Sequence, residues 1–302
     1  MGKKNKWTAA DIPNQKGRVA IVTGSNVGLG LEDARALVAK DATVIMAIRN
    51  IEKGETARKQ ILNQHPDADV KVMQLDLASL DSVKGFAKEF REKYDRLDIL
   101  INNAGVMMPP YSKTADGFEM QFGTNHLGHF ALTGLLLNLI LKTERSRIVT
   151  VSSNAHRWGN IQFDDLNFEK EYNKEKAYGQ SKIANLYFTY ELQRKLAKAG
   201  KSTIAAAAHP GWTATNLQQY SGFFRFLNPL FAQGTDMGAL PTLYAATAPN
   251  VRGGDYYGPS GLGEWRGYTK KVKSNTASHD EAIAAQLWQI SEEWTGVKYN
   301  LS

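Results

Sequence analysis

Cysteine is absent from the 302-residue sequence. The absence excludes thiol nucleophiles, disulfide bonds and every zinc site that depends on cysteine ligands. Such a chain suits the cytosol or any compartment in which the redox state does not matter. We therefore expect a cytoplasmic location.

Long hydrophobic runs are also absent. The longest apolar stretch, residues 130–141, is interrupted by Thr133, Gly134 and Asn138 and is too short to span a bilayer. No apolar segment follows the charged N-terminal residues, and Lys6 stands where a myristoylation signal needs Ser or Thr. We expect neither a signal peptide nor a membrane anchor.

The charge pattern lacks the features of a nucleic-acid-binding protein. The 37 Lys and Arg exceed the 30 Asp and Glu and give a net charge of +7, which suits an anionic ligand or simply a solvated surface. The basic clusters at residues 3–6 and 270–273 are short, and no predicted helix has a basic face with interleaved aromatic residues. We expect no nucleic-acid partner.

Short β-branched runs alternate with longer helical patterns along the chain, and this alternation is typical of parallel βαβ units. The strands, which we expect to be buried on both faces, are residues 18–23, 43–48, 70–75, 98–102, 147–151 and 204–208. The helices are residues 29–40, 52–64, 80–93, 117–142 and 178–199. The predicted α/β fold is a single doubly wound parallel sheet of the Rossmann type, with helices on both faces and a substrate-loop insertion.

No linker divides the chain, so we expect an N-terminal extension at residues 1–16 and one domain at 17–302. Two long irregular segments, residues 154–176 and 211–234, follow strands on the side where such sheets bind ligands. The second is rich in aromatic residues, which fits either a lid over an apolar substrate or an extra packing layer.

A glycine-rich turn, residues 23–30, links the first strand to the first helix, as a dinucleotide-binding site requires. Gly24 permits a tight turn, Gly28 lets the backbone approach a phosphate, and Gly30 lets the helix pack closely. The spacing differs from the common G-x-G-x-x-G, and no Lys-Ser or Lys-Thr follows, which argues against a P-loop nucleotidase. We expect cofactor contacts from Gly24, Ser25, Asn26, Val27, Gly28, Leu29 and Gly30.

The second strand ends at Ile48-Arg49, where an NAD enzyme would place an acidic residue against the ribose. Arg49 would instead pair with the 2′-phosphate of NADP(H), with Lys53 as a second cation, although Arg49 also fits a solvated loop. Asp76 follows the third strand beside Leu77 and could accept a hydrogen bond from adenine, or it could cap the next helix.

Two Y-x-x-x-K pairs occur, at Tyr172 with Lys176 and at Tyr178 with Lys182. The first lies in an all-polar stretch typical of a solvated surface, whereas small residues flank Tyr178 and an apolar stripe follows it. Residues four apart share a helix face, so Lys182 can reach what Tyr178 contacts. A free tyrosine has a pKa near ~10, so catalysis near neutral pH needs a nearby positive charge such as Lys182 or an oxidised nicotinamide.

Taken together, six motifs in order resemble the short-chain dehydrogenase/reductase family from about Gly17 onward, most closely its retinol dehydrogenase-like and protochlorophyllide reductase-like branch. They are T-G-S-N-V-G-L-G at 23–30, N-N-A-G at 102–105, N-H at 125–126, V-S-S ending at 153, Y-x-x-x-K at 178–182 and P-G-W-T-A-T at 210–215.

This resemblance implies an NADP-dependent enzyme that interconverts a carbonyl and an alcohol. It gives Tyr178 the role of proton donor, lets Lys182 hold the nicotinamide ribose and lower the tyrosine pKa, and lets Asn125 hold a water in a proton relay. Ser153, rather than its neighbour Ser152, would bind the substrate oxygen. The implied cofactor contacts are Asn103, Ala104 and Gly105 on the adenosine side and Pro210, Gly211, Thr213 and Thr215 around the nicotinamide.

The histidines do not form a metal site, because no carboxylate or third histidine lies at usable spacing from His126 and His129. We expect His126, His129, His156 and His209 to be structural, with His156 also in a position to touch substrate. Met107, Met108, Trp158 and Trp212 could line an apolar pocket for a small or medium-sized substrate.

Two alternative functions stay open: reduction of a carbon–carbon double bond, and NADP sensing without catalysis. The complete set of catalytic residue types argues against a sensor. The absence of cysteine argues against the first, because the resembling double-bond reductases use one. A homo-oligomer is compatible with the sequence.

Overall fold

The computed structural model describes residues 6–213 and 233–301. Their strands form one eight-stranded sheet in the order β3-β2-β1-β4-β5-β6-β7-β8, parallel except for β8, which runs antiparallel to β7. The strands are β1 (Val19–Thr23), β2 (Thr43–Ile48), β3 (Val70–Gln74), β4 (Ile99–Asn102), β5 (Arg147–Val151), β6 (Ile204–Ala208), β7 (Tyr256–Pro259) and β8 (Thr269–Lys271). The predicted doubly wound sheet is confirmed, and β7 and β8 extend it.

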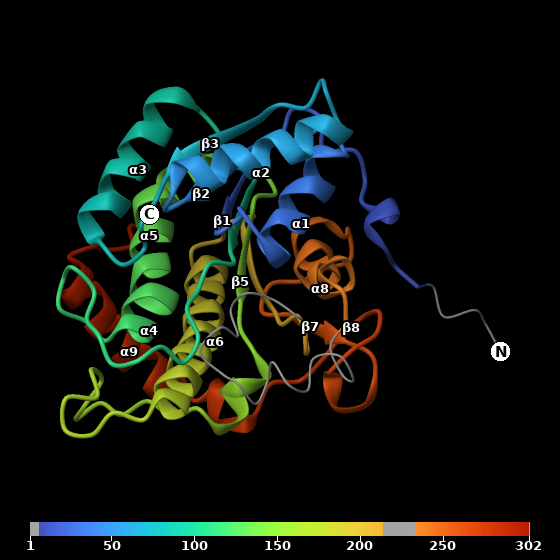
Figure 1. Ribbon diagram of the computed structural model, residues 1–302. Coiled ribbons are helices and arrows are strands. Elements are labelled where there is room, and N and C mark those ends of the chain that lie inside the picture. Colours follow the sequence, from blue (N-terminus) through green and yellow to red (C-terminus); the bar gives the residue numbers. More distant parts are fainter. Residues whose placement is uncertain (1–5, 214–232, 302) are drawn as a thin grey trace.

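Helices cover both faces of the sheet (Figure 1). One face carries α1 (Gly28–Val38), α2 (Ile51–Gln64) and α8 (Thr235–Thr247), whose apolar residues form one core cluster with the strands. The other face carries α3 (Leu80–Lys93), α5 (Gly128–Lys142), α6 (Lys174–Lys198) and α9 (Glu281–Thr295), which build a second cluster. The two cores hold the strands rigidly, so the loops at the strand ends are attached to a fixed frame.

Three sequence expectations are wrong in detail. Residues 117–142 are not one helix: they contain α4 (Met120–Phe122), a π-helical turn (Gly123–Leu127) and then α5. The edge strand β3 is not buried on both faces, because it has only one neighbouring strand and exposes Lys71 and Gln74. Helix α6 begins at Lys174, where the Asn173 side chain accepts a hydrogen bond from the Lys176 N–H and caps it.

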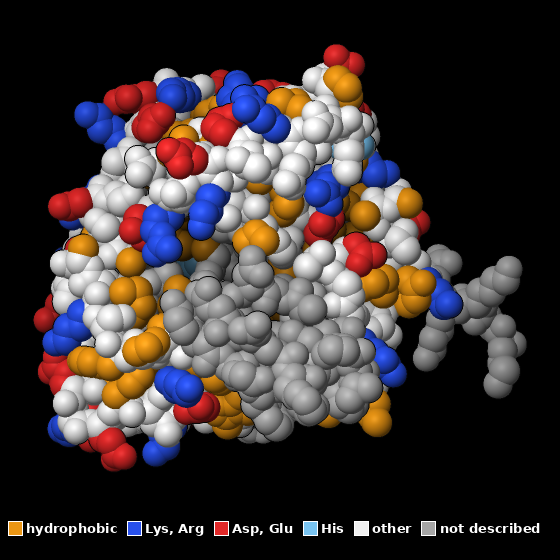
Figure 2. Space-filling model, in the orientation of Figure 1, with side chains coloured by type: hydrophobic (Ala, Val, Ile, Leu, Met, Phe, Trp, Pro, Cys, Tyr) orange, Lys and Arg blue, Asp and Glu red, His pale blue; other side chains and the backbone are white. Residues whose placement is uncertain are grey.

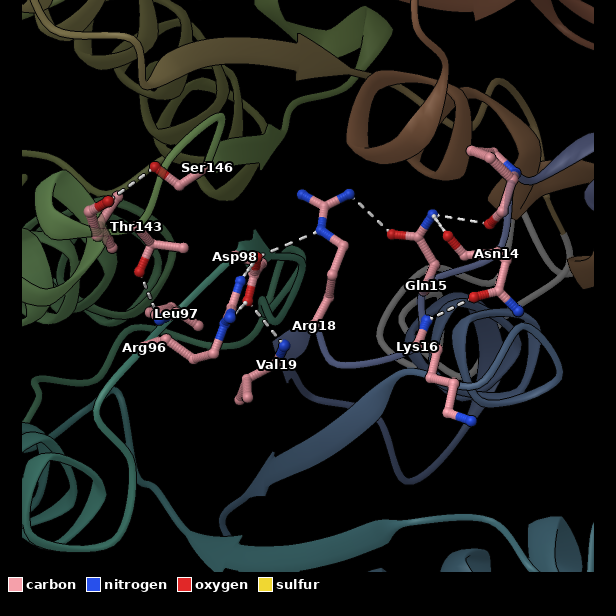
Figure 3. Close-up of polar contacts among 12 residues, drawn as sticks. Asn14, Gln15, Lys16, Arg18, Val19, Arg96, Leu97, Asp98, Thr143 and Ser146 are labelled. Carbon is pink, nitrogen blue, oxygen red and sulfur yellow. Dashed lines mark hydrogen bonds and ion pairs between the residues drawn. The ribbon is translucent and has the colours of Figure 1, made fainter.

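The amino ends of β1 and β4 are joined by the buried carboxylate of Asp98 (Figure 3). It accepts hydrogen bonds from the Val19 N–H at 2.9 Å, from Arg96 at 2.8 Å and from Arg18 at 3.3 Å. Burial alone would raise the pKa of Asp98, but Arg96 and the Val19 N–H hold it below its usual value. This network stabilises the sheet edge opposite the carboxyl ends of the strands.

The exposed charges are mixed in sign. On the face drawn in Figure 2, Lys and Arg side chains alternate with Asp and Glu and do not form a continuous basic surface. Within residues 6–213 and 233–301, no helix is long and apolar enough to cross a membrane.

Candidate active site

A cleft of about 570 Å³ lies at the carboxyl ends of the parallel strands, where ligands bind in doubly wound sheets. Most of the predicted cofactor and catalytic residues line it. They are Gly24, Asn26, Val27, Gly28, Leu29, Gly30, Arg49, Asp76, Leu77, Asn103, Ala104, Gly105, Ser153, Tyr178, Lys182, Pro210, Gly211 and Thr213.

Two predicted site residues, Ser25 and Asn125, do not line the cleft. Ser25 is buried and donates a hydrogen bond to the Val22 carbonyl at 2.9 Å, because the tight turn points its side chain toward the strand. Asn125 is buried behind the cleft wall. Thr215 lies outside the described residues, as does most of the predicted lid at 211–234.

The glycine turn has the shape of a phosphate cradle. Gly24 and Gly28 have φ values of 67° and 62°, a region that side chains disfavour. A Cβ on Gly24 would lie 2.9 Å from the Ala104 Cβ, and one on Gly30 would lie 2.5 Å from Asn103 Nδ2. Helix α1 starts after Val27 without a side-chain cap, so its first N–H groups face the cleft and suit an anion. These residues fit the pyrophosphate of a dinucleotide.

Thr23 ties this cradle to the loop after β4. Its hydroxyl accepts hydrogen bonds from the N–H groups of Asn103 and Ala104, both at 2.9 Å. The Asn103 side chain in turn donates to the Thr23 carbonyl at 2.8 Å. The N-N-A-G segment therefore supports the sheet edge and lines the cleft at the same time.

The far end of the cleft is cationic. The exposed Arg49 and Lys53 both line it, and in the described chain neither side chain forms an ion pair. Asp76 is the only carboxylate among the described lining residues. Its Oδ1 accepts from the Ala78 N–H at 3.0 Å, whereas Ser79 caps α3, so Asp76 is not the helix cap.

The catalytic candidates meet at the other end. Burial raises the pKa of Tyr178 to about 12, and a hydrogen bond with Ser153 lowers it in part. Burial also lowers the pKa of Lys182 to about 8, and its Nζ lies 5.6 Å from the centre of the Tyr178 ring. With a pKa of about 8, Lys182 is mostly protonated at pH 7 and lies close to the Tyr178 ring, and its role in lowering the tyrosine pKa stays a prediction.

The hydrogen bonds of Ser152 and Ser153 indicate which of the two can bind a substrate oxygen. Ser152 is buried and its hydroxyl donates to the Lys182 carbonyl at 2.8 Å, which occupies its only proton. The Ser153 hydroxyl accepts from the Ala155 N–H at 3.2 Å, and its proton is free for Tyr178 or a ligand oxygen. The structure therefore favours Ser153.

Asn125 acts on the backbone of the cleft wall. Its amide oxygen accepts from the Val106 N–H at 2.8 Å, and its amide nitrogen donates to the Val106 carbonyl and to Ser181, each at 2.9 Å. A Cβ on Gly105 would lie 2.9 Å from Asn125 Oδ1 and 3.7 Å from Lys182 Nζ. The side chain is thus fully bonded, and the relay through a water stays a prediction.

The four histidines predicted to be structural make internal contacts. His126 bonds Ser291, His129 bonds Thr23 and the Asn125 carbonyl, and His209 bonds Glu264. His156 is completely buried between the Ser153 carbonyl and the Asn275 N–H and does not line the cleft. In the described ranges no cluster of metal-binding side chains occurs.

Apolar side chains surround the catalytic end, among them Met107, Met108, Trp158 and Trp212. Trp265, which was not predicted from the sequence, also lines the cleft from the loop between β7 and β8. Its carbonyl accepts from the Trp212 N–H at 2.7 Å, and the two rings lie 5.7 Å apart. Its glycine-rich surroundings, G-L-G-E-W-R-G at 261–267, were the available signal of a shaped loop.

Comparisons with known proteins agree with this geometry. The family model of short chain dehydrogenases matches residues 18–222. Retinol dehydrogenase 14 of Mus musculus is 40% identical, covering 93% of this chain and 86% of its own length. Retinol dehydrogenase 11 of Homo sapiens is 41% identical with 93% and 86% coverage.

Solved structures give the same result. The crystal structure of an uncharacterized protein from Mycobacterium paratuberculosis superimposes with a TM-score of 0.83 at 44% identity and covers 98% of this chain and 99% of that one. A Shigella flexneri short chain dehydrogenase complexed with NADP has a TM-score of 0.65 at 23% identity, covering 79% of this chain and 95% of that one. The latter supports the fold alone.

Proposed function

This chain belongs to the short-chain dehydrogenase/reductase family, on its retinol dehydrogenase-like branch, and on that basis we propose that it is an NADP-dependent enzyme interconverting a carbonyl and an alcohol on an apolar substrate. The observation that carries the proposal is the meeting of Tyr178, Ser153 and Lys182 at one end of a cleft whose other end is a glycine cradle.

The proposed cofactor is held by the backbone of the glycine turn and by the loop after β4. Arg49 and Lys53 support a preference for NADP(H), because two cations without carboxylate partners in the described chain suit a 2′-phosphate. When bound, NADPH supplies a hydride to a carbonyl carbon, and NADP⁺ takes one back in the reverse direction.

The chain's own residues handle the proton. Ser153 donates a hydrogen bond to the carbonyl oxygen, and the Tyr178 hydroxyl transfers its proton to that oxygen as the alcohol forms. The buried phenol suits this role because its raised pKa keeps the proton available at neutral pH. Lys182 provides ammonium donors beside the phenol, where the cofactor ribose would lie, and Asn125 fixes the wall behind it.

Purified protein with NADPH and a panel of aldehydes and ketones is the test. We expect carbonyl-dependent oxidation of NADPH, slower with NADH, and a decrease of about 10²- to 10⁴-fold in kcat for Tyr178→Phe. Tyr244→Phe, a substitution in α8 outside the cleft, serves as the control and should keep full activity. Equal turnover by Tyr178→Phe and the wild type would refute the assignment.

A further inference from the structure

Met108 has an unusual backbone conformation next to the catalytic tyrosine. Its φ is +52°, a left-handed value that a residue with a bulky side chain rarely adopts, and the residue is only 3% exposed. Such a conformation persists only when surrounding groups hold it, and it is concentrated at functional sites.

A buried glutamine holds the Met108 backbone. The Gln121 Oε1 accepts a hydrogen bond from the Met108 N–H at 2.8 Å, and the Gln121 side chain is completely buried. Its Nε2 donates to the Tyr172 hydroxyl at 3.1 Å and to the Lys174 carbonyl at 3.0 Å. The amide oxygen and the amide nitrogen of Gln121 are therefore both hydrogen-bonded, and they link the Met108 backbone to Tyr172 and to the start of α6.

Tyr172 completes a hydrogen-bond network, which we call the Gln121–Tyr172 network. Its hydroxyl donates to the Pro109 carbonyl at 2.9 Å, immediately after Met108, and its ring packs against Tyr111 at 5.0 Å. The Gln121–Tyr172 network joins the loop after β4, helix α4 and the start of α6, the helix that carries Tyr178. Tyr172 is therefore not the solvated surface residue that its polar sequence context predicts.

The Gln121–Tyr172 network determines where the apolar wall of the cleft lies. Met107 and Met108 both line the cleft, and together with Ala155 they form an apolar cluster with Tyr178. Methionine side chains are flexible and polarisable, so they suit an extended apolar group better than one rigid shape.

We propose that Gln121 and Tyr172 are positioning residues for substrate specificity. They hold Met108 in its left-handed conformation, so that Met107 and Met108 form a wall for the alkyl chain of a long-chain aldehyde or alcohol whose oxygen lies at Tyr178. This inference rests on the proposed function and adds the substrate class to it.

The first test compares Tyr172→Phe with wild type on decanal and propanal, with NADPH. Losing the hydroxyl leaves the Pro109 carbonyl without its donor and Gln121 Nε2 with the Lys174 carbonyl alone, so we expect the KM for decanal to rise about tenfold, as for the loss of a buried hydrogen bond. The rise should be at least fivefold larger for decanal than for propanal, with kcat changed less than KM. Tyr111→Phe is the matched control, because the Tyr111 hydroxyl makes no hydrogen bond in the described chain.

Met108→Gly removes the wall without straining the backbone. Glycine adopts the left-handed conformation without strain, which offsets part of the stability lost with the buried side chain, so the variant should stay folded with a lower Tm while losing the same preference for decanal. Adding Tyr172→Phe to it should cost no further selectivity, because the wall is already gone. An additive double variant, or equal KM increases for both aldehydes, would overturn the proposal.

A binding experiment keeps the two proposals distinguishable. If wild type oxidises no NADPH with either aldehyde, the proposed function fails. Titration calorimetry of decan-1-ol into the cofactor-free protein then tests whether the Met107–Met108 wall binds an alkyl chain, independently of any turnover. We expect Tyr172→Phe to bind decan-1-ol about tenfold more weakly than wild type or Tyr111→Phe. Equal affinities would contradict the positioning role.

Discussion

Lys182 carries a charge where burial makes charge costly. Its pKa is lowered to about 8 from 10.5, a difference that corresponds to roughly 3 kcal/mol at neutral pH. Replacing it by methionine, which has a similar length, should therefore raise the unfolding free energy of the cofactor-free protein at pH 7 by about 1–3 kcal/mol. The Val151 carbonyl keeps a donor in Asn185, so the substitution leaves no acceptor unpaired.

The pH dependence identifies the cause. Below pH 8 the lysine is protonated in both states and the folded state bears the full penalty. Between pH 8 and 10.5 the folded state loses its proton first, so wild type gains stability and the difference from Lys182→Met shrinks. Urea unfolding across this pH range measures the difference in unfolding free energy between wild type and Lys182→Met. Lys176→Met, at an exposed lysine, is the control. A pH-independent difference would contradict the account.

Residue types could be predicted from sequence where a single side chain defines the chemistry. Tyr178, Ser153 and Lys182 fall in this class and meet in the cleft. Roles that depend on packing could not be predicted: the polar neighbours of Tyr172 hide its contact with Gln121.

At the scale of elements, the first turn of α1 is defined by close approach. A Cβ on Gly30 would lie 2.5 Å from Asn103 Nδ2 and 2.7 Å from the Gly24 carbonyl. Gly30→Ala should therefore displace the N-N-A-G loop, lower the unfolding free energy by about 1–3 kcal/mol and weaken NADPH binding. Thermal unfolding and NADPH fluorescence titration measure the two effects.

Gly85 provides the matched control. It lies on the exposed side of α3, and a Cβ there would meet no atom within 4 Å. Gly85→Ala should stabilise the protein by about 0.5–1 kcal/mol and leave NADPH affinity unchanged. If both alanine variants behaved alike, steric contact at Gly30 would not be the reason for that glycine.

Elements with strong periodicity were predictable, and α3 begins and ends at the predicted residues. The π-helical turn at Gly123–Leu127 was not, because one extra residue in a helical turn barely alters a hydrophobic pattern. The short strands β7 and β8 and the Trp265 loop between them were missed because strands of three or four residues lack a readable alternation.

On the scale of the whole molecule, the sheet separates stability from chemistry. The Asp98 network joins the amino ends of β1 and β4, whereas the cleft occupies the carboxyl ends of the strands. The alternation of strands and helices was enough to predict that division, because parallel strands direct all their carboxyl ends to one edge. The substrate could not be predicted, since the residues that line the cleft come from segments far apart in the sequence.

The central claim is transfer of a hydride to a carbonyl carbon beside Tyr178. Its most direct measurement uses NADPH deuterated at C4 of the nicotinamide on the transferred face, decanal as acceptor, and mass spectrometry of the product. We predict decanol with one deuterium on the carbon that bears the hydroxyl, and about 10²- to 10⁴-fold less labelled product from Tyr178→Phe in the same time. Unlabelled alcohol from the complete reaction would contradict the account.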